Sequence, residues 1–141
     1  MSTPDEAWMR EAFKLVRLCP PSKTAYSVGA IVVDREGREL ARGYSRDTDP
    51  HVHAEESALS RLAGDPRLAD AVLYSTLEPC AQRSALRPTC VELILRSGLR
   101  QVVIGAREAN RFVADPQGYE VLTAAGVKVR ELSVLPPAML P

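Results

Sequence analysis

One histidine and two cysteines in this sequence have the residue types and the setting of a metal site. His53 lies two residues before Glu55, Cys80 follows Pro79, and Cys90 comes ten positions after Cys80. One imidazole and two thiolates make a tetrahedral zinc ligand set that leaves the fourth position open for water. Soft thiolates also disfavour magnesium and calcium. We therefore expect His53, Cys80 and Cys90 to hold one zinc ion.

Glu55 would be a spare carboxylate beside this metal. It cannot share a lateral helix face with His53, but both side chains can reach a site at the first turn of a helix. The positive end of that helix would favour bound hydroxide and thiolate. A carboxylate placed there can take a proton from water and deliver it to a leaving group. We expect Glu55 to be this general acid and base, and the Ala54 N–H to donate to the substrate.

The same histidine and cysteines could instead have structural roles that involve no catalysis. An isolated histidine is usually a satisfied surface or core residue, and a free cysteine is often simply buried. A redox pair is disfavoured, because nine residues separate the two cysteines and oxidoreductases use Cys-x-x-Cys. Cys19, which precedes two prolines, has no companion motif, and we expect it to be structural. The alternative of another class is a zinc module used only for binding, although structural zinc sites usually have four ligands.

Length and composition favour one globular domain. The chain has 141 residues, of which 45% are hydrophobic and 26% charged, and these values are typical of a single folded unit. We place the domain at residues 1–141, with a core over about 4–132 and a Pro-rich tail at 135–141. No apolar run approaches the ~18 residues of a membrane span. The first ten residues also lack the apolar centre of a signal peptide.

Charge and cysteine usage narrow the partners and the compartment. The 18 basic residues balance 18 acidic ones, which disfavours nonspecific binding to nucleic acid or anionic membrane. Three cysteines are an odd number, which disfavours a disulfide framework. We therefore expect a cytoplasmic protein with no membrane partner and no nucleic-acid partner.

The pattern of apolar residues predicts an α/β fold. A helix is expected from Pro4, with Thr3 and Glu6 as a capping box. Two strands at 28–33 and 39–44 then read as an antiparallel hairpin. Later elements are expected at 54–62 (helix), 71–76 (strand), 90–97 (helix), 102–104 (strand), 118–125 (helix) and 127–132 (strand). Strands separated by helices indicate a parallel sheet covered on both faces. We predict a three-layer α/β/α domain whose mixed five-stranded sheet opens with an N-terminal β-hairpin.

The segment His53-Ala54-Glu55, followed by Thr76-Leu77-Glu78-Pro79-Cys80, resembles the cytidine-deaminase-like zinc deaminases. The resemblance runs from about residue 28 to 132. In cytidine and tRNA adenosine deaminases the second cysteine follows the first by three positions, whereas here it follows by ten. A longer spacer that ends in Arg-Thr-Pro-Pro-Cys occurs in the pyrimidine deaminases of riboflavin biosynthesis. The segment Arg87-Pro88-Thr89-Cys90 is similar to it, as are the Val-Gly-Ala strand at 28–33 and the segment 118–127.

Two segments depart from the riboflavin family. Ala25-Tyr26 stands where that family usually has Asn-Pro, and residues 81–86 lack its usual Ser/Thr-His and Gly. Those positions face the substrate in relatives, so the substrate stays open between the diaminopyrimidine ribotide and an aminopyrimidine of another pathway. These 141 residues do not include the reductase domain that is often fused in bacteria, so we expect a riboflavin enzyme of this length to need a separate reductase.

The resemblance implies a zinc-dependent hydrolytic deaminase. Its substrate would be a small amino-substituted pyrimidine or related heterocycle, free or as a nucleoside or nucleotide, and its product would include ammonia. Cytidine or deoxycytidylate deamination and tRNA adenosine deamination are the alternatives within enzymes. We also expect a homodimer.

Five residues are candidates for contacts with the substrate. Besides the Ala54 N–H, Tyr26 could stack on a heteroaromatic ring, Arg83 and Arg87 could hold a phosphate, and Glu78 could position the substrate or its own loop. Packing or surface roles are the alternatives for these side chains. We expect His51 to be exposed or beside the pocket. Glu56 should lie on the helix surface or form a local ion pair.

Overall fold

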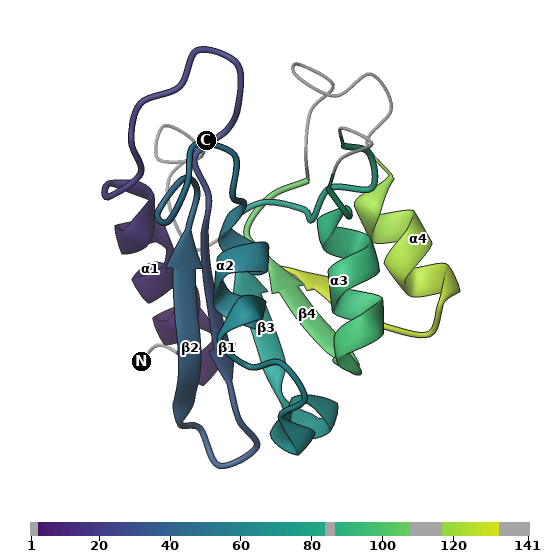
Figure 1. Ribbon diagram of the computed structural model, residues 1–141. Helices are drawn as coiled ribbons and strands as arrows, with labels where there is room; N and C mark the ends of the chain where they lie inside the picture. Colours follow the sequence, from purple (N-terminus) through teal and green to yellow (C-terminus); the bar gives the residue numbers. More distant parts are fainter. Residues whose placement is uncertain (1–2, 84–86, 108–116, 133–141) are drawn as a thin grey trace.

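Helices alternate with strands along the chain in the computed structural model, which describes residues 3–83, 87–107 and 117–132 (Figure 1). A short 3₁₀ helix, η1, precedes β3. In chain order the elements are α1 (Pro4–Val16), β1 (Gly29–Val33), β2 (Glu39–Tyr44), α2 (Ala54–Ser60), η1 (Pro66–Asp70), β3 (Val72–Ser75), α3 (Cys90–Ser97), β4 (Gln101–Ile104), α4 (Gly118–Ala124) and β5 (Lys128–Glu131).

The strands form one mixed sheet in the order β2-β1-β3-β4-β5. β1 is antiparallel to both of its neighbours and pairs Ala30 with Gly43 of β2 and with Ser75 of β3. β3, β4 and β5 are parallel to one another, because helices connect them. The predicted five-stranded mixed sheet of an α/β protein is confirmed.

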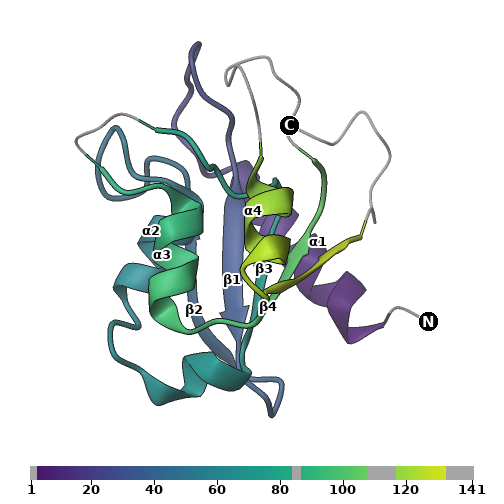
Figure 2. The ribbon, with the colours of Figure 1, turned by 90° about the vertical axis from the view of Figure 1, so that its right-hand side faces the viewer.

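Helices cover both faces of the sheet (Figure 2). Side chains alternate between the two faces along β1, so this strand supplies buried side chains to both. α1 packs on one face against Ile31 and Val33. α2, α3 and α4 pack on the other face, where Ala30 and Val32 point. Every residue of β1 is buried, which explains its uninterrupted apolar sequence.

Capping residues determine where the helices begin. Thr3 and Glu6 form the predicted capping box of α1. Thr89 caps α3, because its Oγ1 accepts a hydrogen bond from the Glu92 N–H at 3.1 Å. Gly98 ends the same helix in the left-handed conformation, with φ of 86°. The cap therefore places Cys90 at the first helical position of α3.

The predicted element boundaries agree with the observed ones to within two residues. α2 ends at Ser60 rather than at residue 62, because the chain turns there toward Gly64 (φ 73°) and η1. β3 ends at Ser75, whose hydroxyl donates to the Leu77 carbonyl at 2.7 Å and turns the chain out of the sheet. The predicted Pro-rich tail at 135–141 lies outside the described residues. Within the described ranges, no helix is both long and apolar enough to cross a membrane.

Candidate active site

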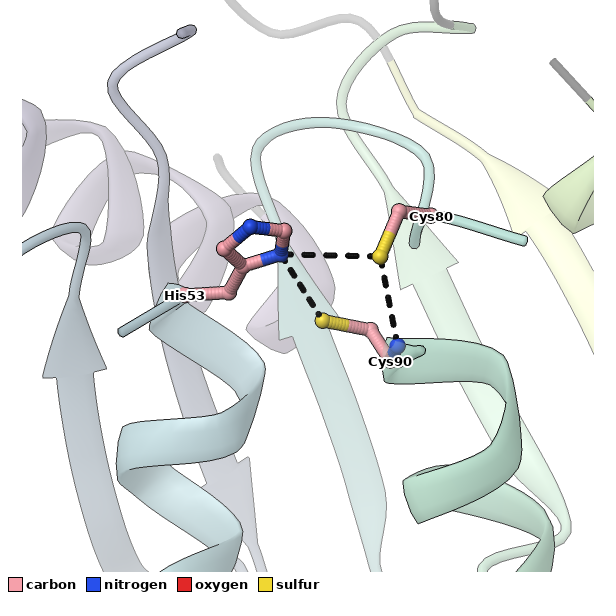
Figure 3. Close-up of side chains that lie close together, drawn as sticks. All are labelled: His53, Cys80 and Cys90. Atoms are coloured by element: carbon pink, nitrogen blue, oxygen red, sulfur yellow. Dashed lines mark hydrogen bonds between the residues drawn. The ribbon is translucent and has the colours of Figure 1, made fainter. Parts of the chain in front are cut away.

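Three segments that are distant in sequence meet at one end of the sheet. His53 is the N-cap of α2, Cys80 lies in the loop after β3, and Cys90 is the first residue of α3. Figure 3 shows the two thiols and the imidazole pointing toward one another from these segments. The fold therefore brings together all three predicted zinc ligands.

The distances between the three side chains suit a tetrahedral zinc ion. His53 Nδ1 lies 3.5 Å from Cys80 Sγ and 3.4 Å from Cys90 Sγ, and all three ligand atoms lie within 4.8 Å of one another. Zinc–sulfur bonds of about 2.3 Å and zinc–nitrogen bonds of about 2.0–2.1 Å require about 3.6 Å between nitrogen and sulfur in a tetrahedron. The donor set and its spacing thus fit zinc, and Nδ1 is the imidazole atom that faces the metal position.

The protonation of the two thiols is set by their mutual contact. The Cys90 N–H, in the first turn of α3, donates to Cys80 Sγ at 3.3 Å. Hydrogen bonding from Cys90, followed by that from His53, lowers the pKa of Cys80 to about 4. The side-chain hydrogen bond between the two thiols, together with complete burial, raises the pKa of Cys90 above its ordinary value. Zinc binds cysteine as the thiolate, so metal binding would release a proton from a protonated Cys90 thiol.

Glu55 lies beside the ligand cluster without joining it. Its side chain is buried, with a relative exposure of 3%, and the cluster of metal-ligand atoms in the described residues does not include its carboxylate. Burial raises the pKa of Glu55 to about 7, against the opposing effect of the nearby His53 imidazole. A carboxyl group with this pKa suits proton transfer in both directions near neutral pH.

A cavity of about 320 Å³ opens onto the cluster. This volume is within the range of small-molecule sites. Of the five predicted substrate contacts, the cavity reaches four: Ala54, Tyr26, Glu78 and Arg83 line it and Arg87 does not. The other lining residues are Ser22, Thr24, Ala25, Val28, Ser45, Arg46, Pro50, His51, Val52, His53, Glu55, Leu77, Cys80 and Gln82.

Arg46 holds one wall of this cavity, and sequence reasoning missed it. Its guanidinium donates to the Pro20 carbonyl at 2.9 Å, to the Tyr26 carbonyl at 3.2 Å and to Ser27 Oγ at 2.7 Å. The backbone of Arg46 has a φ of 64°, which an L side chain rarely adopts. No motif marks the position, and neither the strained φ nor the distant carbonyls can be read from neighbouring residues.

Glu78 anchors the loop that carries Cys80. Its buried carboxylate accepts the Tyr119 N–H at 2.7 Å and the Arg107 Nε–H at 3.4 Å. Gly118 allows this approach, because a Cβ there would lie 1.9 Å from the Pro79 carbonyl oxygen. Glu78 was predicted to position either the substrate or its own loop. These contacts are the kind that positions the loop.

Arg83 and Arg87 form ion pairs with acidic residues before and within α2. Both guanidinium groups reach Glu56, and Arg87 also pairs with Asp49. Glu56 is therefore half-buried, and its ion pairs are with residues about thirty positions later in the chain rather than with a charged neighbour on its own helix. Binding of a phosphate by either arginine stays a prediction.

His51 and Cys19 lie outside the ligand cluster. His51 is exposed at the rim of the cavity, as expected. Cys19 is half-buried, and its Sγ lies 3.5 Å from the Val28 carbonyl oxygen. This contact is compatible with the structural role that we expected for Cys19.

Comparison with protein families gives one match that covers most of the chain. Residues 2–106 match the model of the cytidine and deoxycytidylate deaminase zinc-binding region. A curated relative, the diaminohydroxyphosphoribosylamino-pyrimidine deaminase of Schizosaccharomyces pombe, is 35% identical over 129 residues, which are 89% of this chain and 31% of the relative. The tRNA-specific adenosine deaminase of Rickettsia bellii is 32% identical over 109 residues, which are 72% of this chain and 70% of the relative.

The solved structures that resemble this chain are also deaminases. The Rib2 deaminase of Aspergillus oryzae, in complex with DARIPP, has a TM-score of 0.80 and 28% identity, and the match covers 93% of this chain and 85% of that one. A deaminase/reductase of Thermotoga maritima has a TM-score of 0.73 and 32% identity, over 91% of this chain and 36% of that one. The chain thus spans about a third of the length of the curated riboflavin relatives that it matches.

Proposed function

The chain belongs to the zinc-binding cytidine and deoxycytidylate deaminase family, and from this premise we propose that it deaminates the phosphoribosylaminopyrimidine of riboflavin biosynthesis. The observation that carries the proposal is the arrangement of Glu55, buried beside His53, Cys80 and Cys90 at the end of a cavity of about 320 Å³. A carboxylate that does not bind the metal, beside a zinc site with three protein ligands, can act as the general base in hydrolysis. A structural zinc site does not require such a carboxylate.

Each step of the proposed reaction has a residue in place. A zinc ion held by His53, Cys80 and Cys90 would supply an activated water molecule. Glu55 would take one proton from that water and deliver it to the ring nitrogen while the water oxygen bonds to the carbon that carries the amine. It would then take the second proton, from the new hydroxyl group, and deliver it to the amine, so that the carbon–nitrogen bond breaks and ammonia leaves. The Ala54 N–H, in the first turn of α2, donates to the substrate. Burial of Glu55 keeps bulk water from competing for the proton that it carries.

The choice of substrate is supported by the relatives. The curated Schizosaccharomyces pombe relative is named for this pyrimidine ribotide, and the Aspergillus oryzae structure, of which the match covers 85%, holds DARIPP. Tyr26 lines the cavity and would stack on the pyrimidine ring. Arg83 also lines the cavity and would face the phosphate.

A tRNA adenosine deaminase is the second candidate, because the Rickettsia bellii relative is covered over 70% of its length. Equal numbers of basic and acidic residues argue against this polyanionic substrate.

We also propose that the protein acts in the cytoplasm, because its cysteine ligands must stay reduced. We propose a homodimer, with a pathway reductase as its partner enzyme.

Ammonia release from a panel of substrates tests the proposal. The zinc-loaded protein is offered the pyrimidine ribotide, its dephosphorylated riboside, cytidine, deoxycytidylate and tRNA, each at the same concentration. We expect turnover on the ribotide, and a higher KM for the riboside if the phosphate is bound. Turnover on cytidine or deoxycytidylate alone would move the protein to the nucleoside branch. Turnover on tRNA alone would overturn the assignment.

A further inference from the structure

One carboxylate oxygen of Glu56 is the meeting point of the three segments that carry the zinc ligands. Glu56 Oε1 accepts the His53 N–H at 3.1 Å, Arg83 Nη2 at 2.9 Å and Arg87 Nη1 at 3.4 Å. The first contact belongs to the capping box of α2, which fixes the backbone of a ligand. The other two contacts come from the spacer between the cysteines.

Besides Glu56, the Arg83 side chain contacts two backbone carbonyl groups. It lies three positions after Cys80, and its guanidinium also donates to the His51 carbonyl and, at 3.1 Å, to the Pro88 carbonyl. Pro88 lies two residues before Cys90, so this one side chain bridges the segment that leads to His53 and both ends of the spacer. A planar guanidinium with five donors can make such a bridge, whereas a lysine cannot.

The Glu56–Arg83 ion pair is more buried than the Asp49–Arg87 ion pair. The side-chain exposure is 7% for Arg83 and 20% for Glu56, but 33% for Arg87 and 37% for Asp49. Charge-assisted hydrogen bonds are stronger where water is excluded, and exposed ion pairs contribute little. We therefore expect the Glu56–Arg83 pair to contribute most to holding these segments together. The Arg87–Asp49 pair, 2.8 Å apart and more exposed, is a matched control for it.

We propose that Glu56 and Arg83 are positioning residues that hold His53, Cys80 and Cys90 in ligand geometry before zinc binds, and so determine the affinity for zinc. A metal site built from three separate segments must pay the ordering entropy of those segments when the ion binds. A nine-residue spacer between the cysteines adds to that cost. A buried ion pair that fixes the spacer against α2 lowers the cost in advance. The inference rests on the zinc site of the proposed function.

Zinc affinity, measured by competition with a chromophoric chelator, tests the proposal without any substrate. Glu56→Gln keeps an oxygen for the His53 N–H but loses the charge that Arg83 requires. Partners of metal ligands typically contribute 10–100-fold to metal affinity, and we expect a loss in this range for Glu56→Gln and for Arg83→Gln. Asp49→Asn makes the same chemical change at the exposed end, and we expect its zinc affinity to stay within about threefold of the unaltered chain.

Two further measurements distinguish positioning from general destabilisation. The double variant Glu56→Gln/Arg83→Gln should bind zinc no more weakly than the weaker single variant, because no buried charge is left unpaired. The d–d bands of the cobalt-substituted single variants should shift or broaden, while those of Asp49→Asn should not. Should a Gln variant fail to fold, Arg83→Lys carries the test, since it keeps the charge but loses the bridge to two carbonyls.

The outcomes distinguish this inference from the proposed function. Single variants that bind zinc as tightly as the unaltered chain would overturn the positioning role and leave the deaminase assignment intact. An equal loss of zinc affinity in Asp49→Asn would also overturn it. Failure of the unaltered chain to bind zinc would instead overturn the proposed function itself.

Discussion

At the scale of single residues, the proposed reaction assigns metal binding and proton transfer to different side chains. One nitrogen and two sulfurs are placed to hold a metal ion, and Glu55 lies outside this ligand set with a pKa raised to about 7 by burial. The placement of His53 and Glu55 at one site was predictable from sequence, because two residues of a His-x-Glu pair at a helix start can both reach a site at its first turn. The pairing of Glu56 with Arg83 was not, because nothing local indicates which distant cation a carboxylate will meet.

Replacing Glu55 with glutamine should separate proton transfer from metal binding. Glu55→Gln keeps the size of the side chain but cannot carry a proton, so we expect turnover to fall by on the order of 10²–10⁴ or more. Zinc content and melting temperature should match those of the unaltered chain, as measured by elemental analysis and circular dichroism. Near-normal ammonia release would remove Glu55 from catalysis. A loss of zinc together with activity would make it a ligand.

Cys90→Ser should have the opposite effect and remove the metal. The hydroxyl of serine is a poor replacement for a thiolate at zinc, and Cys90 is completely buried at the start of α3. We expect zinc per chain to fall from about one to well below one, with a lower melting temperature because the metal no longer ties the loop after β3 to α3. Cys19→Ser is the control, and it should keep its zinc. Full zinc occupancy in Cys90→Ser would exclude Cys90 from the site.

At the scale of elements, caps and close approaches decide where the site residues lie. The start of α3 at Cys90 was predicted correctly, because Thr89 and Gly98 are strong local signals for the two ends of a helix. The approach of α4 to the Cys80 loop was not predicted. It depends on a glycine at 118 that has no φ requirement and on a carboxylate of Glu78 from forty positions earlier.

Gly118→Ala should disturb the zinc site from a distance. The new Cβ would lie 1.9 Å from the Pro79 carbonyl oxygen, so α4 or the Cys80 loop must shift. Overpacking of this kind costs about 1–3 kcal/mol, and we expect both a lower melting temperature and weaker zinc binding. Gly98→Ala is the control, since its φ of 86° makes the substitution strained, but no atom lies within 4 Å. It should lower the melting temperature and leave zinc affinity unchanged; an equal loss of affinity in both variants would refute the link between α4 and Cys80.

At the scale of the whole molecule, the sequence was sufficient for the architecture. The apolar segment at 28–33 was predicted as a strand, and the alternation of strands with helices predicted a sheet covered on both faces; β1 lies between β2 and β3 with helices on both sides of the sheet. What could not be predicted is the antiparallel pairing of β1 with β3, because sequence order does not determine which strands become neighbours. The shape of the cavity depends on such neighbours, and on the Arg46 contacts with residues 20–27.

The balance of charge over the chain predicts weak binding to RNA. With 18 basic and 18 acidic residues, few phosphates can be neutralised, so few counterions are released. We expect the affinity for labelled tRNA to be low and to change little between 50 and 200 mM salt, as followed by fluorescence anisotropy. A steep decrease of affinity over that range would indicate a basic surface patch and would favour the tRNA-type alternative.

The proposed reaction, deamination of an aminopyrimidine, requires a single zinc ion per chain. The most direct test adds zinc stepwise to the metal-free protein and measures the rate of ammonia release from the pyrimidine ribotide. We predict a rate that rises linearly and stops rising at about one zinc per chain. Ammonia release that is independent of zinc, or its absence at one zinc per chain, would contradict this account.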